Sequence, residues 1–209
     1  MKFEDLRDKT RFYPIFKLED VFKWFPKADR RTVIFQLSLW TRRGLLEHLK
    51  RGIYKIADYE IKDSFILANF LYSPSYISLE TALNYYSIIP DVPFSVTSVS
   101  TKKTNTFRLK RYGQFNYVQI KPDLFFGFET IVPEKNYSYN IALPEKAVFD
   151  LLYFRSRDSF FMPEKFLAEA RFTFEKDFHW EFLRKWEKII PALRKKFHCA
   201  LNLLFKKYD

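Results

Sequence analysis

A short stretch of this chain concentrates hydrogen-bond donors at helical spacing. Between Asp29 and Gly44 there are four arginines and one serine, and a basic turn follows a few residues later. Such side chains donate to phosphate oxygens and to the base edges of nucleic acids. The candidate DNA-contacting residues are Arg30, Arg31, Ser38, Arg42, Arg43, Lys50 and Arg51. Their chemistry favours an anionic polymer as the ligand.

The residues from about 30 to 43 follow the period of an α-helix. At about 100° per residue, one stripe is apolar and is predicted to face a core. This stripe consists of Val33, Leu37 and Trp40. The opposite side carries Arg31, Phe35, Ser38 and Arg42. Asp29 is a good N-cap for this helix, and Gly44 is a common C-terminal stop.

The elements around this helix predict a winged helix-turn-helix over residues 1–60. Residues 18–25 show a short amphipathic pattern that Pro26 ends. After the helix predicted over residues 30–43, two short apolar runs flank a basic turn that contains Gly52, which is a hairpin signal. In such a fold the second helix enters the major groove of double-stranded DNA, and the wing lies along the backbone.

Phe35 leaves two interpretations of this segment open. The first is DNA binding, in which this large apolar side chain, on the side of the helix that faces the DNA, contacts a thymine methyl group. The second is a winged domain used only for protein contacts, in which Arg31 and Arg42 are ordinary solvated charges and Phe35 packs on another domain. The sequence does not choose between them.

The composition is that of a folded, basic protein. The 209 residues are 47% hydrophobic and 20% aromatic, and the formal net charge is +11. Residues 1–60 hold 14 basic and 9 acidic side chains, a net charge of +5, which attracts phosphate backbones. A single cysteine cannot form an internal disulfide, the N-terminus lacks the apolar run of a signal peptide, and no stretch approaches the roughly 18 apolar residues of a membrane span. We therefore expect a cytoplasmic protein.

No set of residues predicts an enzyme, a metal site or a cofactor. The three histidines are far apart in the chain, and the four glycines form no phosphate-binding loop. Asp123 and Glu129 flank a strand, but the lysine that a nuclease motif needs nearby is absent, so Asp123 is interpreted as a turn cap. Glu145 and Asp150 are assigned to helix stability and surface charge. Cys199 is interpreted as a buried structural thiol.

Residues 61–209 are predicted to form an α+β domain. Two short helices come first, one capped by Asp63 or Ser64 and the other by Ser78. Alternating runs between residues 94 and 142, separated by turn residues, predict several antiparallel strands.

Helical patterns return near the C-terminus. Pro-Glu-Lys triplets at 144 and 163 precede apolar periodic runs and are interpreted as helix starts. The last helical stretch runs from Trp180 to about Phe205 and is interrupted by Pro191. The fold class of the whole chain is therefore α+β, with a winged domain first and C-terminal helices last.

Four segments, in the same order, resemble the AbiEi-type antitoxins, the antitoxin and regulator components of bacterial type IV toxin–antitoxin (abortive infection) modules. The first segment is the wing region, and the other three lie in the second domain. Together the four segments place the resemblance over about residues 18–152. The segments are Arg43 to Leu46 with Lys50 to Tyr54, Ser75 to Leu83, Val96 to Thr101, and Pro144 to Leu152.

This resemblance implies a biological setting. Members of the family repress their own operon by binding inverted repeats in double-stranded DNA. They counteract a nucleotidyltransferase-like toxin without a stable complex. A different function, RNA binding through Trp180, Trp186, Arg184 and Lys185, would use stacking and charge in the C-terminal half.

Overall fold

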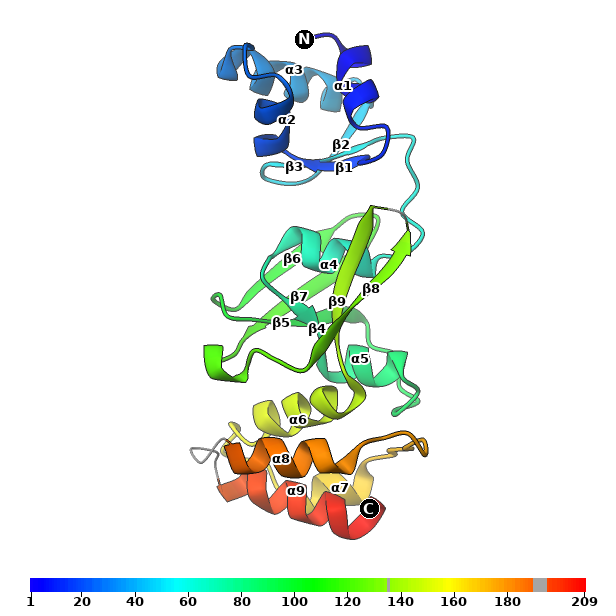
Figure 1. Cartoon of the computed structure of the whole chain (residues 1–209), viewed down its shortest axis with the longest axis vertical. Coiled ribbons are helices and arrows are strands. Elements are labelled where there is room, and N and C mark those ends of the chain that lie inside the picture. The colour runs from blue at the N-terminus through cyan, green and yellow to red at the C-terminus, as the bar shows by residue number, and fades with distance from the viewer. Residues whose placement is uncertain (135, 190–194) are drawn as a thin grey trace. The chain divides into compact units, whose positions relative to one another are not determined.

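Figure 1 shows the computed structural model of the chain, which describes residues 1–134, 136–189 and 195–209. The chain divides into two compact units. Unit 1 holds Met1–Leu67 and Val132–Ser138, and unit 2 holds Ala68–Ile131 and Tyr139–Asp209. The sequence suggested a single cut near residue 60, whereas in the structure a second segment from far along the chain joins the N-terminal unit.

Unit 1 contains three helices that gather on one side of a small antiparallel sheet (Figure 1). The strand order in this sheet is β1-β3-β2, so the hairpin β2–β3 receives β1 on the outer edge of β3. The elements are α1 (Phe3–Lys9), β1 (Ile15–Lys17), α2 (Leu18–Trp24), α3 (Arg30–Arg42), β2 (Leu46–Lys50) and β3 (Ile53–Ile56). The helices and the hairpin expected from residues 18–56 are confirmed, whereas α1 and β1 were not predicted.

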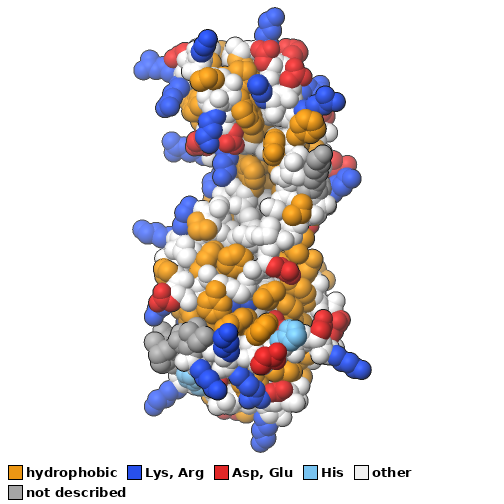
Figure 2. All heavy atoms as spheres, in the orientation of Figure 1, with side chains coloured by type: hydrophobic (Ala, Val, Ile, Leu, Met, Phe, Trp, Pro, Cys, Tyr) orange, Lys and Arg blue, Asp and Glu red, His pale blue; other side chains and the backbone are white. Residues whose placement is uncertain are grey.

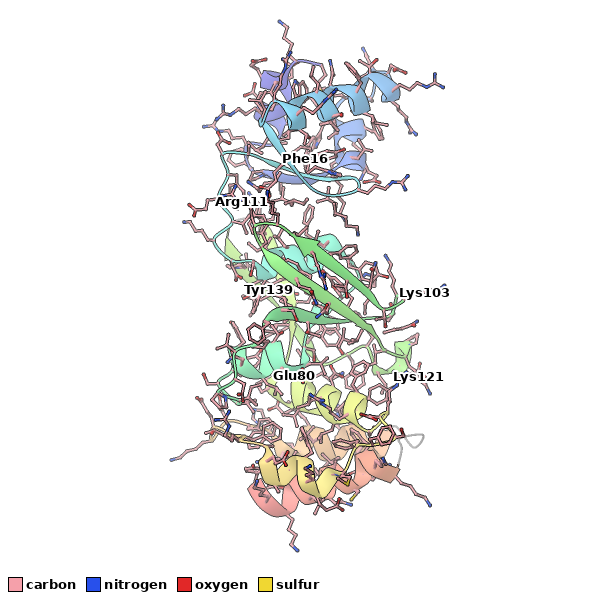
Figure 3. The ribbon with its side chains drawn as sticks, turned by 180° about the vertical axis from the view of Figure 1, so that it is seen from behind. Phe16, Glu80, Lys103, Arg111, Lys121 and Tyr139 are labelled. Carbon is pink, nitrogen blue, oxygen red and sulfur yellow. The ribbon has the colours of Figure 1, made fainter. Side chains whose placement is uncertain are left out.

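The core of unit 1 lies between its helices and its sheet. Helices α1 to α3 and strands β1 to β3 all contribute, because the apolar stripe of each helix must be buried against another element. The buried cluster consists of Leu6, Phe16, Val21, Val33, Leu37, Trp40, Leu46 and Ile56. Phe16, labelled in Figure 3, stacks on the ring of Tyr54 with 6.0 Å between centroids.

Two side chains of the segment Val132–Ser138, Tyr137 and Asn136, bond to the N-terminal part of unit 1. The hydroxyl of Tyr137 accepts a hydrogen bond from the backbone N–H of Ile15 over 2.6 Å and lies 3.3 Å from the carbonyl oxygen of the same residue. Asn136 adds a hydrogen bond to the carbonyl oxygen of Phe12 at 3.2 Å. The Tyr137 contact satisfies backbone groups of the edge strand β1, and the Asn136 contact satisfies a carbonyl group in the turn before it.

Unit 2 is built on a six-stranded mixed sheet with the order β6-β7-β5-β4-β9-β8. The tips of β8 and β9 belong to unit 1. The strands are β4 (Tyr76–Ile77), β5 (Ser95–Ser100), β6 (Asn105–Leu109), β7 (Gly113–Gln119), β8 (Phe128–Glu134) and β9 (Tyr137–Ala142). The α+β class is shown by this sheet together with the helices.

The strand directions correct the prediction of an antiparallel sheet. The pairs β5–β7 and β4–β9 are parallel, while β6–β7 and β4–β5 are antiparallel. Alternating hydrophobicity has the same period in both kinds of pair, so it predicts a strand but not its partner or direction. Because β5 and β7 end at the same edge, Lys103 and Lys121 lie along one edge of unit 2 (Figure 3).

The described helices after Asp63 lie wholly or mostly in unit 2. They are α4 (Phe65–Leu71), α5 (Leu79–Tyr85), α6 (Pro144–Arg155), α7 (Pro163–Glu169), α8 (Trp180–Ile189) and α9 (Lys195–Tyr208), and a 3₁₀ turn spans Pro122–Leu124. The helix starts at Pro144 and Pro163 are confirmed. The predicted interruption at Pro191 lies outside the described residues.

Helices α6 to α9 gather at one end of unit 2 (Figure 1). Helix α6 contacts α5, α8 and α9, and α7 packs on α9. Within the described residues, none of the helices combines the length and the apolar character that crossing a membrane requires.

Candidate nucleic-acid interface

The start of α3 is fixed by Asp29. One carboxylate oxygen of Asp29 accepts the backbone N–H of Thr32 over 2.9 Å and the hydroxyl of the same residue over 3.0 Å. These hydrogen bonds favour the charged form and hold the pKa of Asp29 below its ordinary value, the backbone bond contributing most. The predicted N-cap is confirmed. At the other end, Gly44 has a φ of +72°, a conformation that suits glycine after the last helical residue.

Packing against the core decides which side of α3 is exposed. Val33, Leu37 and Trp40 are buried, as the helical period predicted. The ring of Phe3 from α1 meets the Trp40 ring edge-on, with 5.3 Å between centroids. Because this stripe cannot turn away from the core without exposing three large side chains, the opposite side of the helix is held toward solvent.

The predicted contact residues of α3 all lie outside the core. Arg31, Ser38 and Arg42 share the exposed side with Phe35. Arg30 is exposed on one flank, with its guanidinium carbon 5.0 Å from the ring centroid of Phe22 on α2. The geometry therefore brings the predicted donors of α3 to one accessible side and its edges. Arg43 is exposed at the C-cap.

The hairpin turn carries the remaining two predicted residues. Arg51 is exposed and Lys50 is half-buried. The turn is closed by Gly52, whose φ of +77° suits a residue without a Cβ. The carbonyl oxygen of Gly52 accepts the backbone N–H of Leu18 over 2.8 Å, which fastens the turn to the first residue of α2. Arg51, the residue before Gly52, is thus held next to the start of α2, the helix that precedes α3.

Lys55, which follows this turn on β3, is not part of the surface. Its side chain is 1% exposed and its ammonium donates to the carbonyl oxygens of Ile56, Ala57 and Tyr59 over 3.0, 3.2 and 2.7 Å. Three carbonyl oxygens satisfy its three N–H donors. Sequence reasoning missed this role, because a lysine in a basic hairpin has the pattern of a surface charge.

The charged side chains of α3 itself are all of one sign. From Arg30 to Leu46 the chain contains four arginines and no acidic residue. Figure 2 shows Lys and Arg side chains projecting around much of the visible face of unit 1, with acidic clusters between some of them. A helix that carries cations near both ends and contains no acidic residue complements a phosphate backbone.

The described residues hold a second polar cluster, deep in unit 2. Lys146 and Asp150, one turn apart on α6, form an ion pair in which both side chains are fully buried. The Lys146 ammonium also donates to the Tyr76 hydroxyl over 2.9 Å. The carboxylate of Asp150 accepts the hydroxyls of Tyr76 and Ser78 over 2.9 and 2.8 Å.

The structure of this region corrects three sequence predictions. Asp150 is not a surface charge, because it is fully buried, and neither is Glu145, which is 2% exposed and accepts the backbone N–H of His179 over 2.7 Å. Ser78 does occupy the N-cap position of α5, but its hydroxyl donates to Asp150 instead of capping the helix. The i, i+4 spacing of lysine and aspartate was the available signal, although it is equally typical of an exposed pair.

Burial changes the titration of the cluster. It lowers the pKa of Lys146 and raises that of Asp150, while the attraction between the two charges opposes both shifts. Burial also raises the pKa of the Tyr76 hydroxyl, which therefore stays protonated. All these polar groups are closed off from solvent and satisfied by one another, so the cluster joins β4 to α6 and offers no access to a ligand.

The three histidines do not come together in one site. His48 is exposed beside Tyr54, His179 pairs with Glu181, and His198 pairs with Glu187. In the described part of the chain no three His, Cys, Asp or Glu side chains lie together as a metal site would need.

Three further sequence predictions concern residues of unit 2. Cys199 is half-buried rather than buried, and the Glu164 carboxylate lies 3.6 Å from its sulfur. Desolvation raises the pKa of this thiol, and the Glu164 carboxylate adds to the shift, which opposes reactivity. Asp123 lies in the 3₁₀ turn after Pro122. The rings of Trp180 and Trp186 pack against other aromatic rings, so neither is a free platform for stacking a base.

The sequence matches no protein-family model and no curated protein. The class of site described above therefore rests on the geometry of unit 1.

Proposed function

We propose that unit 1 is a winged helix-turn-helix that binds double-stranded DNA. In this proposal α3 enters the major groove and the β2–β3 hairpin is the wing. The observation that carries it is the exposed side of α3, where Arg31, Ser38 and Arg42 lie opposite a buried apolar stripe. The order of three helices and a hairpin fits the same fold.

The predicted residues take two roles in this proposal. Arg31, Ser38 and Arg42 face base edges and the nearest phosphates, since they occupy the middle of the exposed side. The residues at the margins contact phosphates and set the position of the helix in the groove. These marginal residues are Arg30, Arg43, Lys50 and Arg51.

We further propose that the chain is an autoregulator and antitoxin of a type IV toxin–antitoxin module. Support comes from the resemblance of four segments to the AbiEi-type antitoxins, among them the basic hairpin turn and the start of α6. The ligand is then an inverted repeat upstream of its own gene. The functional partner is a nucleotidyltransferase-like toxin, which unit 2 helps to counteract without a stable complex. The chain itself carries out no catalysis.

DNA binding is tested with the full chain and a fluorescent duplex from the region upstream of its gene. Arg31→Ala and Arg42→Ala are expected to weaken binding at least tenfold each, a loss of about 1.4 kcal/mol or more. Arg11→Ala is the matched control, because it removes the same charge from another exposed site of unit 1. No binding to the upstream duplex even at low salt would end the autoregulator proposal, and no binding to any duplex would end the proposal of DNA binding.

A protein-interaction module that binds no DNA is the second candidate, and one observation favours it. Phe35 is 62% exposed, and large exposed apolar side chains are common at protein interfaces. This function predicts a protein partner whose binding survives high salt and is lost in Phe35→Ala but not in Arg31→Ala. The upstream duplex separates the two candidates, because only the first binds it.

A further inference from the structure

One side chain on the exposed side of α3 cannot contact phosphate. Phe35 follows Arg31 by one turn and precedes Ser38 by one turn, within about 30° of the middle of this side. Its phenyl ring is 62% exposed to solvent. A ring in this place leaves apolar surface in water between hydrogen-bond donors.

The folding of unit 1 gives no reason for this ring. Helix α3 is attached to the core by Val33, Leu37 and Trp40, which point the other way. A polar residue would serve the helix equally well at an exposed position. An exposed phenylalanine at position 35 is therefore explained by the ligand that binds the exposed side of α3.

The surroundings of Phe35 favour DNA over a second copy of this chain. Two copies meeting through this side would bring arginines of the same sign together, with no acidic residue between Arg30 and Leu46 to offset them. A duplex supplies the opposite charge in its phosphates. It also supplies one apolar group on the base edges of the major groove, the C5-methyl group of thymine.

We propose that Phe35 is a specificity-determining residue that contacts a thymine methyl group in each half-site. This inference rests on the proposed DNA-binding function and names the sequence class that it reads. Each half-site contains thymine at the base step beneath the middle of α3, and the donors at Arg31 and Ser38 flank that step.

Ile34 provides an internal control for this assignment. It is also apolar and 47% exposed, but it lies about 100° around the helix from Phe35, on the flank that carries Arg30. A general preference for apolar surface would involve both residues. Contact with one methyl group in the groove involves Phe35 alone.

The experiment replaces thymine by deoxyuridine, which lacks only the methyl group. Duplexes are first selected from a random pool with the full chain, and each thymine of the selected site is then replaced singly. The wild-type chain is expected to lose about three- to fivefold in affinity at one position per half-site, the effect of one buried methyl group. Phe35→Ala should bind both duplexes equally, whereas Ile34→Ala should keep the preference for thymine.

Two results would overturn the inference while DNA binding stands. One is a selected duplex whose affinity is unchanged by deoxyuridine at every position. The other is an Ile34→Ala variant that loses the thymine preference together with Phe35→Ala. If the chain binds no duplex from the pool at any salt concentration, the proposed function fails instead.

Discussion

Glu47 and Lys55 face each other across the β2–β3 hairpin, with 3.3 Å between the carboxylate Oε2 and the ammonium Nζ. The two partners differ in environment, since the Lys55 side chain is buried and that of Glu47 is partly exposed. The same ammonium closes the loop after β3 through three carbonyl oxygens. The base of the proposed wing is therefore held by one lysine.

Replacing Lys55 by Met should destabilise unit 1 substantially. The variant keeps the length of the side chain but leaves carbonyl oxygens without their donor, at an expected cost of about 2–4 kcal/mol in the free energy of unfolding. Glu47→Gln should cost less than about 1 kcal/mol, since its carboxylate is partly solvated. Urea unfolding, followed by amide resonances of unit 1, measures both. Equal effects of the two variants would contradict the role given to Lys55.

Arg51 at the hairpin tip should contribute one phosphate contact. In the wild-type chain the logarithm of the DNA affinity is expected to fall steeply with the logarithm of the salt concentration. Arg51→Ala should reduce that slope by about 0.9, the effect of releasing one fewer counterion per contact. Binding titrations at several salt concentrations give the slope. Ser38→Ala is the comparison, since it carries no charge and should leave the slope unchanged.

Asp29 should titrate below an ordinary aspartate. Its pKa is lowered in the folded state by the hydrogen bonds from Thr32, so its stabilising effect on α3 is present above the unfolded-state pKa and is lost as the pH falls through the folded-state pKa. The Thr32 amide resonance reports this directly by NMR, with an expected midpoint below 3.8, the ordinary value. Asp29→Asn should abolish the step. A midpoint at or above the ordinary value would rule out the capping hydrogen bond in solution.

Removing one member of the buried pair on α6 should be far more damaging than removing both. Lys146→Met leaves the carboxyl group of Asp150 buried without its cation, at an expected cost of about 3–5 kcal/mol. The double variant Lys146→Met with Asp150→Leu should recover a large part of that loss, because no uncompensated charge stays behind. Chemical unfolding of unit 2 compares the two. A double variant as unstable as the single one would show that the pair acts through packing alone.

The amino-acid sequence by itself determined the elements whose signals are local. The bounds of α3 follow from Asp29 at its start and Gly44 at its end, and its exposed side follows from the positions of Val33, Leu37 and Trp40. The β2–β3 hairpin follows from a basic turn with a glycine between two apolar runs. These features are decided within a few residues by capping, backbone conformation and helical period, so no distant part of the chain is needed to predict them.

Only the tertiary structure decided which charges are buried and which strands are partners. Asp150 is paired with Tyr76, and Ile15 with Tyr137, across 74 and 122 positions of the sequence. Lys55 and Lys146 have the sequence pattern of surface cations, yet both are buried. The carbonyl oxygens around Lys55 come from residues within four positions of it, whereas Lys146 also donates to the hydroxyl of Tyr76 from far away in the sequence. Hydrophobic period shows which side of an element is apolar, but a buried charge is stable only where its hydrogen-bond and ion-pair partners are enclosed with it. That condition depends on the assembled fold rather than on any local stretch of the chain.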